Sequence, residues 1–136
     1  MPPPFTHIVD ASALIAYFKG EQGHERLAAL LMDERNKLAI HIVNLCEVYY
    51  GYLRSDGPQR ANEAWERATK LLGLDKTIDE DFVRRVGRWK VNSGLGLGDS
   101  FLAACVEQYA AILVTADHGD FDRVQETGFI RVDFIR

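Results

Sequence analysis

The stretch ILVTADHGDFD, residues 112–122, decides how the fold of this chain is interpreted. It opens with an apolar, partly β-branched run at 112–115, which predicts a buried strand. Three carboxylates follow within six residues, at Asp117, Asp120 and Asp122. The first question is therefore whether these acids form a solvated loop or whether at least one of them carries chemistry.

The rest of the chain alternates between strand-like and helix-like patterns. Further strands are predicted at 8–9, 38–43 and 130–135, the last as a half-buried edge strand, with a weaker one at 76–78. Apolar residues at helical spacing predict helices at about 14–18, 27–35, 44–52, 59–72 (closed by Gly73), 79–90 and 99–106. Strands that alternate with helices predict an α/β fold with a mainly parallel sheet.

Length and composition indicate an ordinary globular protein. The 136 residues suit a single domain spanning 1–136, with 47% hydrophobic and 26% charged residues. No apolar run approaches the roughly 20 residues of a membrane span, and the N-terminal MPPPFT lacks the order of a signal peptide. We therefore expect a cytoplasmic protein with no membrane contact. Cys46 and Cys105 have no zinc-site spacing, so we expect two buried, reduced thiols.

The charge balance restricts the possible partners. A net charge of −4 and a pI of about 5.5 argue against tight, non-specific nucleic-acid binding driven by counterion release. A nucleic-acid partner would need something else to neutralise its phosphates.

Four acids stand where this topology brings distant segments together. Asp10 ends the first strand, Glu47 follows the second by one helical turn, Asp99 opens a helix, and Asp117 follows the strand 112–115. In a parallel α/β sheet, the carboxyl ends of strands and the amino ends of helices share one edge, where ligands usually bind. We therefore predict that the four carboxylates converge on one cleft.

Such a cluster indicates a metal site. Like charges a few ångströms apart destabilise a fold unless a cation joins them. Oxygen ligands without His or Cys favour Mg²⁺ or Mn²⁺ over zinc. An ion held in this way can lower the pKa of a bound water and polarise a phosphoryl oxygen, which suits phosphodiester hydrolysis. Bridging metal would also let an acidic protein hold a polyanion.

Each acid also has a simpler explanation. Asn44 and Glu47 have the spacing of a capping box. Asp99 could be a cap or a favourable charge at a helix N-terminus. Asp10 could be held by backbone partners at the end of a buried strand.

Four motifs occur in order along the chain: VDASAL at 9–14, NLCEVYYG at 44–51, LGDSFLAA at 97–104 and LVTAD at 113–117. Together they resemble the PIN-domain ribonucleases, and most of all the VapC type of toxin from toxin–antitoxin pairs. The resemblance covers essentially the whole chain. It implies a three-layer α/β/α fold with a central sheet of four to five strands, an Mg²⁺- or Mn²⁺-dependent endoribonuclease, a homodimer, and a cognate antitoxin as partner.

The resemblance also assigns roles to residues by position. The metal-binding acids of the family are matched by Asp10, Glu47, Asp99 and Asp117. Ser12 matches a small polar residue two positions after the first acid, and Thr115 a hydroxyl that supports the last acid. Asn44 stands where many relatives have Thr or Ser. Because relatives vary in the position of the fourth acid, Asp120 is the alternative to Asp117, whereas Asp122 is interpreted as a solvated cap of a short final helix.

Other signals are weaker. The loop SGLGLGD at 93–99 follows a helix and lacks a closing Lys-Ser/Thr pair, so it fits neither a P-loop nor a dinucleotide motif. We expect its glycines to let the backbone pass close to the metal site. His41 and His118 are expected to be structural or solvated. The densest basic patch is either a solvated helix face or a contact for RNA phosphates, and it consists of Arg84, Arg85, Arg88 and Lys90.

Two other functions compete with the nuclease. A phosphatase could use Asp10 as its nucleophile, but the haloacid dehalogenase type needs an acid where this chain has Ser12. A PIN-fold binding module without catalytic activity is the rival from another class, and the presence of all four acids argues against it.

Overall fold

Five strands form one parallel sheet in the computed structural model, which describes residues 4–136. Residues 1–3, which begin the N-terminal segment considered above, lie outside the described residues. The strand order is β3-β2-β1-β4-β5, and every neighbouring pair is parallel. The strands are β1 (His7–Val9), β2 (Leu38–His41), β3 (Gly73–Asp75), β4 (Ile112–Thr115) and β5 (Arg131–Phe134).

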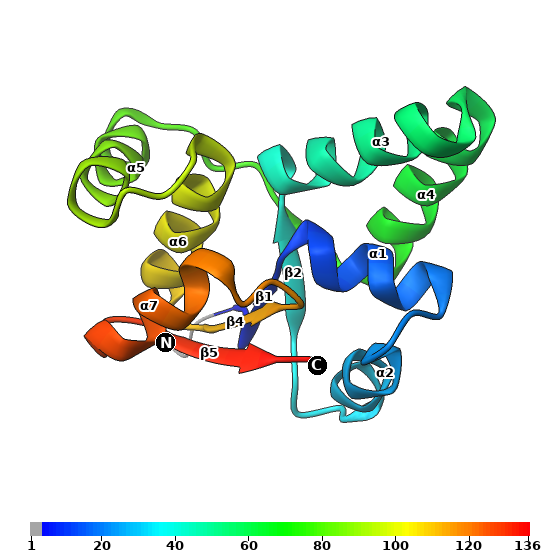
Figure 1. The fold of residues 1–136 in the computed structure, drawn as a ribbon, viewed down its shortest axis with the longest axis horizontal. Helices are drawn as coiled ribbons and strands as arrows, with labels where there is room; N and C mark the ends of the chain where they lie inside the picture. Colours follow the sequence, from blue (N-terminus) through cyan, green and yellow to red (C-terminus); the bar gives the residue numbers. More distant parts are fainter. Residues whose placement is uncertain (1–3) are drawn as a thin grey trace.

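Helices cover both faces of this sheet (Figure 1). The helices α1 to α4 pack on one face and α5 to α7 on the other. They are α1 (Ala11–Lys19), α2 (His24–Met32), α3 (Ile42–Asp56), α4 (Pro58–Leu71), α5 (Glu80–Ser93), α6 (Leu97–Tyr109) and α7 (Gly119–Thr127). The predicted three-layer α/β/α architecture is therefore confirmed, with β5 at an edge of the sheet as expected.

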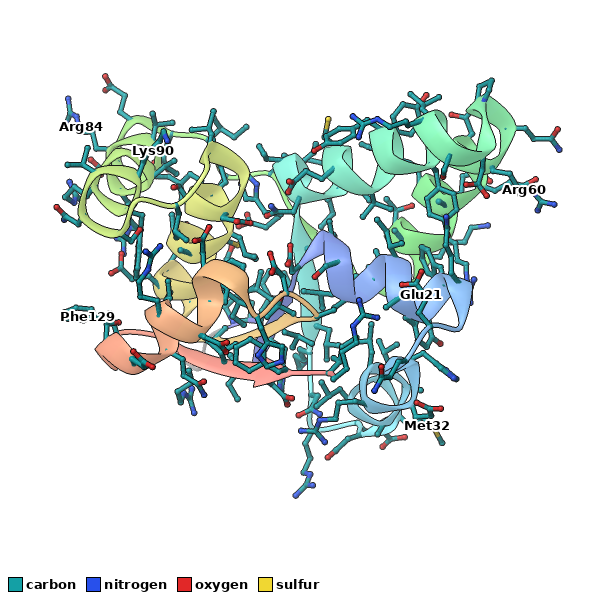
Figure 2. The ribbon with its side chains drawn as sticks, viewed as in Figure 1. Glu21, Met32, Arg60, Arg84, Lys90 and Phe129 are labelled. Carbon is teal, nitrogen blue, oxygen red and sulfur yellow. The ribbon has the colours of Figure 1, made fainter. Side chains whose placement is uncertain are left out.

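Charged side chains cover the outer faces of the helices. Figure 2 shows Arg60 of α4 and Arg84 of α5 at opposite ends of the molecule. On its inner face α4 buries alanines, as its sequence pattern predicted. Among the described residues, no helix combines the length and the apolar character needed to cross a bilayer.

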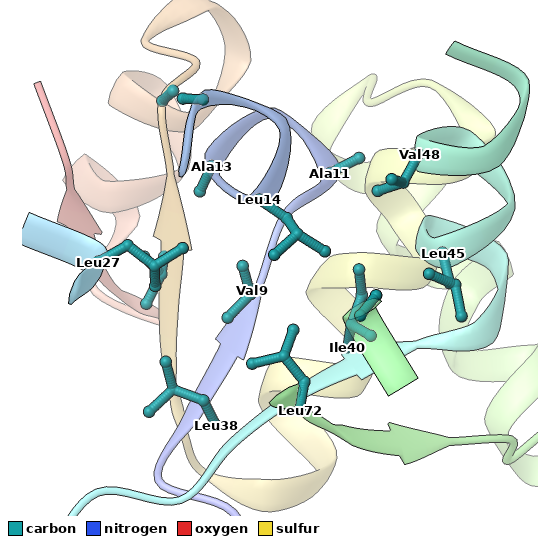
Figure 3. Packing of buried hydrophobic residues seen from close by; sticks show 14 of the residues in the cluster. Val9, Ala11, Ala13, Leu14, Leu27, Leu38, Ile40, Leu45, Val48 and Leu72 are labelled. Atoms are coloured by element: carbon teal, nitrogen blue, oxygen red, sulfur yellow. The ribbon is translucent and has the colours of Figure 1, made fainter. Parts of the chain in front are cut away.

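The central strands are buried on both faces, which is typical of parallel sheets. Ile8 and Leu113 belong to the core beneath α5 to α7, whereas Val9 and Val114 belong to the core beneath α1 to α4. Figure 3 shows Val9 beside Leu14 of α1 in the second of these cores. Burial of each such side chain contributes roughly 1.5–3 kcal/mol, so the two cores hold β1 and β4 rigidly side by side.

The helix predicted from Asn44 begins two residues earlier, at Ile42, so β2 ends at His41. Nδ1 of the buried His41 accepts a hydrogen bond from the backbone N–H of Val43 at 3.1 Å and caps the helix. Its Nε2 lies 2.9 Å from the carbonyl oxygen of Thr77 and donates there, because Nδ1 is the acceptor. His41 therefore has the structural role that we expected.

The strand predicted at 76–78 is wrong, because β3 lies three residues earlier. Gly73 does not close a helix but begins this strand. A Cβ at Gly73 would lie 2.6 Å from Cε1 of Phe5, so the strand needs a glycine where it passes this ring. Just after β3, Oδ1 of Asp75 accepts hydrogen bonds from N and Oγ1 of Thr77 at 3.1 and 2.7 Å. This turn ends β3 at Asp75, so the residues predicted to form a strand, 76–78, lie beyond it.

Candidate active site

The first strand carries Asp10 to the carboxyl edge of the sheet. Its backbone N–H donates to the carbonyl oxygen of Val114 at 2.8 Å, so β1 and β4 stay paired up to the site. The residue is only 5% exposed. Oδ2 accepts hydrogen bonds from the hydroxyls of Ser12 and Thr115, at 2.8 and 2.7 Å. Burial raises the pKa of Asp10 above its ordinary value, and the two hydroxyls oppose that shift.

The two hydroxyls form a network that joins the ends of β1 and β4. The Oγ atoms of Ser12 and Thr115 lie 3.2 Å apart, but each hydroxyl has a single proton and donates it to Asp10. Their oxygens in turn accept backbone N–H groups, from Ala116 at 3.1 Å and from Asp117 at 3.0 Å. Ser12 thus contacts the first acid, Asp10. Thr115, which the resemblance expected to support the last acid, donates its proton to Asp10 and contacts only the backbone of Asp117.

Glu47 reaches the same edge from the first turns of α3. Nδ2 of Asn44 donates to Oε1 of Glu47 at 2.7 Å and to the carbonyl oxygen of Gly98 at 3.1 Å, so it links α3 to the start of α6. A Cβ at Gly98 would lie 2.7 Å from Oε2 of Glu47. The carboxylate therefore lies directly against the backbone of α6. Burial raises the pKa of Glu47; the bond from Asn44 opposes this shift, and the charge of Asp10 adds to it.

Asp99 lies in the first turn of α6, where burial and the negative charges of the neighbouring acids raise its pKa. Its pKa is raised to about 7, by burial first and then by four neighbouring charges, in decreasing order those of Asp10, Glu47, Asp117 and Asp120. Two contacts place these acids near one another: Gly98, the residue before Asp99, lies against the carboxylate of Glu47, and Asp10 accepts a hydrogen bond from Thr115, two residues before Asp117. Asp99 thus lies at the same edge of the sheet as the other three predicted acids, and the charge of Asp120 also acts on it.

The helix-capping alternatives do not hold for two of these acids. The N-cap of α3 is His41, so Asn44 and Glu47 do not form a capping box. The N-cap of α6 is Gly96, and Asp99 lies three residues beyond it. An acid in the first turn still interacts favourably with the helix dipole, but neither carboxylate caps its helix.

The three acids of the opening stretch have different surroundings. Asp117 is exposed, and its Oδ1 accepts the backbone N–H two residues further on, at 2.9 Å. Asp120 pairs with Arg123 at 3.1 Å. Asp122 pairs instead with Nδ1 of His118 at 2.8 Å, in the first turn of α7. Besides burial, the charges of Asp117 and Asp120 are among the main causes that raise the pKa of Asp99.

His118 ties the start of α7 to the C-terminal residue. Its Nε2 lies 2.7 Å from the carbonyl oxygen of Arg136, and its ring stacks on Phe134 with centroids 4.1 Å apart. The carbonyl of Arg136, followed by the carboxylate of Asp122, raises the pKa of His118. These contacts match the structural role predicted for this histidine.

The donors at this edge fit a hard divalent cation. The acidic side chains offer only oxygen atoms, which Mg²⁺ and Mn²⁺ prefer. Oδ1 of Asn44 is also buried here and has no hydrogen-bond partner among the described residues, which costs about 1–3 kcal/mol if nothing compensates. Within residues 4–136, however, no three acidic, His or Cys side chains are gathered closely enough to hold a metal ion, so the acids would have to move closer together to bind one.

The predicted basic patch is divided among different contacts. Arg85 pairs with Glu107 of α6 at 2.8 Å. Lys90 donates to a carbonyl of the loop before α6 at 3.3 Å. Arg88 lies between two surface hollows, one shared with Arg84 and the other with Arg85. Lys90 alone of the four contacts the loop that leads to the acids, so the patch is not a continuous extension of the acidic edge.

The glycines of the 93–99 loop have three separate roles. Only Gly98 brings the backbone close to an acid, as expected. Gly94 ends α5 in the left-handed conformation, with φ of 70°. A Cβ at Gly96 would meet nothing within 4 Å. The prediction of close backbone approach therefore holds at one position.

Two features of the site were missed or mistaken at the level of sequence. Cys105 is buried as expected, but Cys46, next to Glu47, is exposed, which corrects the expectation of two buried thiols. The pairing of Asp120 with Arg123 was not anticipated, although their spacing of three residues on a helix is the signal that indicates it.

The fold and the site together define a class of protein: a three-layer, all-parallel α/β domain with an acidic cluster where the strand order reverses beside β1. The chain belongs to the PIN domain family, which matches residues 7–127. Both the predicted fold and the predicted family are therefore confirmed.

Several solved structures share this fold. VapBC2 from Rickettsia felis, bound to a DNA fragment from its promoter, superposes with a TM-score of 0.75 at 17% identity, covering 95% of this chain and 98% of that one. DNA-bound VapBC from Salmonella typhimurium gives 0.75 and 17%, with 97% and 99% covered. VapC20 from Mycobacterium tuberculosis, described as a toxin that cleaves the sarcin-ricin loop, gives 0.70 and 14%, with 87% and 95% covered. No curated protein matches the sequence at a significant level.

Proposed function

We propose that this protein is a metal-dependent endoribonuclease and the toxin of a type II toxin–antitoxin system. The observation that carries this proposal is the placement of the acids: Asp10 is held by two hydroxyls at the end of β1, and Asn44 links Glu47 to the first turn of α6, which contains Asp99. Burial and the neighbouring acids raise the pKa of Asp99 to about 7, which agrees with this placement. Membership of the PIN domain family supports a nuclease. The similarity in fold to a toxin that cleaves the sarcin-ricin loop supports RNA as the substrate.

The proposed partners follow from the same comparisons. Similar structures from Rickettsia felis and Salmonella typhimurium are VapBC assemblies, and one from Klebsiella pneumoniae is a toxin-antitoxin complex. We therefore propose a cognate antitoxin as partner. From the resemblance of the sequence to VapC-type toxins we further propose a homodimer that acts in the cytoplasm, with residues 1–136 working as one PIN-like nuclease domain.

In the proposed mechanism, Asp10, Glu47 and Asp99 would hold Mg²⁺ or Mn²⁺, and Asp117 or Asp120 would be the fourth acid. Such an ion would supply a water of lowered pKa and positive charge for the phosphate. Ser12 and Thr115 fix one oxygen of Asp10 by donating to Oδ2. RNA would be cut with the ribose 3′-oxygen as leaving group, which leaves 5′-phosphate and 3′-hydroxyl ends.

The other supporting residues prepare the remaining carboxylates. Asn44 orients Glu47 through its Nδ2 and leaves Oδ1 facing no protein partner among the described residues. Asp99, with a pKa of about 7, holds a proton for much of the time at neutral pH, and would release it on binding a cation.

The test is RNA cleavage by the purified protein in Mg²⁺. Asp10→Asn and Asp99→Asn should each lower the cleavage rate by about a hundredfold or more, because each removes a metal-binding charge. Asp122→Asn is the matched control, since this acid lies in the same region but pairs with His118. Equal cleavage by wild type and both site variants would exclude the mechanism.

Expression in cells tests the toxin role separately. Induced wild-type protein should arrest growth and create new RNA ends, and Asp99→Asn should do neither. Arrest by both proteins would mean that toxicity does not depend on the acidic cluster.

A further inference from the structure

A hollow lies away from the acidic edge, between α5, α6 and α7. It has a volume of about 510 Å³, which falls in the range of small-ligand sites. Its lining combines cationic and aromatic side chains, among them Arg85, Arg88, Trp89, Arg123 and Phe129. Neither the acids nor their supporting residues belong to it.

Positive charge is concentrated in this hollow although the chain as a whole is acidic, with a net charge of −4. Three arginines line it, against one acid, Glu107. Arg85 is held by Glu107 at 2.8 Å, with its Nη1 as the donor. Arg88 is exposed and also borders the neighbouring hollow that contains Arg84. The charge therefore suits a polyanion.

The aromatic residues suit bases. Phe129 is 79% exposed, an unusual state for a large apolar side chain, and it borders the same hollow as the half-buried Trp89. Single-stranded nucleic acids bind in this way, with bases stacked on aromatic rings and phosphates held by arginines. The combination favours a nucleotide over a purely apolar or a purely anionic ligand.

Arg123 connects this hollow to the acidic edge. Its Nη2 donates to the carbonyl oxygen of Ser93 at 3.2 Å and to Oδ1 of Asp120 at 3.1 Å. Asp120 is one of the acids whose charge acts on Asp99. One guanidinium therefore lies between the two sites, so a strand that crosses Arg123 could occupy both.

We propose that the hollow lined by Arg85, Arg88, Trp89, Arg123 and Phe129 is a nucleotide subsite that holds single-stranded RNA next to the position of cleavage. The inference rests on the proposed function, because it names where the same substrate continues beyond the acids. Phosphates lie on the arginines, and a base stacks on Phe129 or Trp89.

The first experiment uses tryptophan fluorescence. The chain has two tryptophans, and Trp65 lies on the other face of the sheet, edge-on to Tyr49 at 5.9 Å. Asp99→Asn is introduced to prevent cleavage, and Trp65→Phe or Trp89→Phe then leaves one reporter. Single-stranded RNA of about 12 nucleotides should quench Trp89 in the first variant and leave Trp65 unchanged in the second.

The second experiment measures RNA affinity by fluorescence polarisation in the same Asp99→Asn background. Phe129→Ala should weaken binding by about tenfold, the scale of one lost stacking contact. Met32→Ala is the control, because Met32 is 82% exposed and lies on the opposite side of the molecule (Figure 2). Its affinity should equal that of the parent protein.

Salt dependence tests the arginine contacts. The logarithm of the RNA association constant falls linearly with the logarithm of the salt concentration. Arg88→Ala should make this slope shallower by about 0.7, the value for one phosphate contact in a single strand. Arg60→Ala is the control, because Arg60 pairs with Glu63 on α4, away from the hollow. Its slope should match that of the parent.

The outcomes separate the inference from the function on which it rests. RNA binding without quenching of Trp89, and with equal affinities for Phe129→Ala and Met32→Ala, overturns the subsite and leaves the ribonuclease proposal intact. No RNA binding by the parent protein overturns both. If Trp89 becomes shielded with rising protein concentration in the absence of RNA, a second copy of the chain covers the hollow and the inference is wrong.

Discussion

Gly98 sets the distance between α6 and Glu47. A Cβ at this position would lie 2.7 Å from Oε2 and 3.1 Å from Oε1 of Glu47. Because the clash is with the end of a flexible side chain, the fold can absorb it by moving the carboxylate. The active site is less tolerant of such a movement, since a displacement of about 1 Å can lower the reaction rate by about a hundredfold.

Gly98→Ala should therefore separate activity from stability. We expect a melting temperature close to that of wild type and an RNA-cleavage rate lower by about tenfold or more. Gly96→Ala is the matched control, two residues away, where an added Cβ meets nothing within 4 Å. Full activity of Gly98→Ala would mean that the position of Glu47 does not limit the reaction.

Asp99 makes the metal-free protein sensitive to pH. Its folded-state pKa of about 7 lies above the ordinary value of 3.8, so the folded state binds its proton more tightly than the unfolded state. The cost of ionising Asp99 is absent below about pH 4, grows as pH rises, and is complete above about pH 7. In excess chelator, this residue therefore destabilises the protein as pH rises.

Asp99→Asn should remove that cost. At about pH 8 with chelator we expect the variant to melt a few degrees above wild type, where about 1 kcal/mol corresponds to roughly 3–6 °C. At about pH 3, below the ordinary pKa of 3.8, the two proteins should melt at nearly the same temperature, because wild-type Asp99 is then mostly protonated in both the folded and the unfolded state. A constant difference across this pH range, measured by thermal denaturation, would contradict the assignment of the raised pKa.

At the scale of elements, the edge strand β3 depends on a contact that the sequence does not reveal. Gly73 lies beneath the ring of Phe5, which is 68 residues away in sequence and is itself held edge-on by Tyr109 at 5.0 Å. From the local sequence alone, a glycine that follows a helical pattern is interpreted as the residue that ends the helix. Only the packing of the N-terminal segment against the sheet shows that it is the first residue of a strand.

Gly73→Ala should destabilise the fold by about 1–2 kcal/mol, because the Phe5 ring must move out of a packed position. Gly87→Ala provides a control of opposite sign. Gly87 lies within α5, where a Cβ would meet nothing within 4 Å, and alanine there should stabilise by about 0.5–1 kcal/mol. Denaturant unfolding of both variants measures the difference, and a neutral Gly73→Ala would show that Phe5 adapts freely.

Element boundaries were predictable where local patterns were strong and failed where a long-range partner decided them. The strand 112–115 and the inner face of α4 follow directly from apolar periodicity. The start of α3 does not, because its cap is His41, whose ring is positioned by the carbonyl of Thr77, 36 residues away. Histidine has no strong capping signature, so Asn44 was the more obvious local choice.

At the scale of the whole molecule, parallel topology explains why the acids could be predicted from sequence. Once strands and helices alternate, acids at the ends of β1 and β4 and at the starts of α3 and α6 must meet at one edge. The resemblance indicated the supporting residues Ser12, Asn44 and Thr115, but the particular groups that they contact could not be predicted. The link from Asn44 to Gly98 and the shared hold of Ser12 and Thr115 on Asp10 depend on orientations fixed only by packing.

The same topology couples cation binding to global stability, because the acids come from segments that separate when the protein unfolds. Mn²⁺ at about 100 times its dissociation constant should stabilise the wild-type protein by about 2.7 kcal/mol. Asp10→Asn should lose this thermal shift, and Asp122→Asn, whose acid pairs with His118, should keep it. Absence of a shift in wild type would favour a binding module without catalytic activity.

The same measurement can identify the fourth acid. Asp117 is exposed with one oxygen held by a backbone N–H, whereas Asp120 is engaged by Arg123. Because releasing Asp120 from its ion pair would oppose metal binding, we expect Asp117→Asn to reduce the Mn²⁺ shift and Asp120→Asn to leave most of it. The reverse result would assign the role to Asp120. In that case Arg123 would pair with Asp120 only in the metal-free protein, where its positive charge takes the place of the cation.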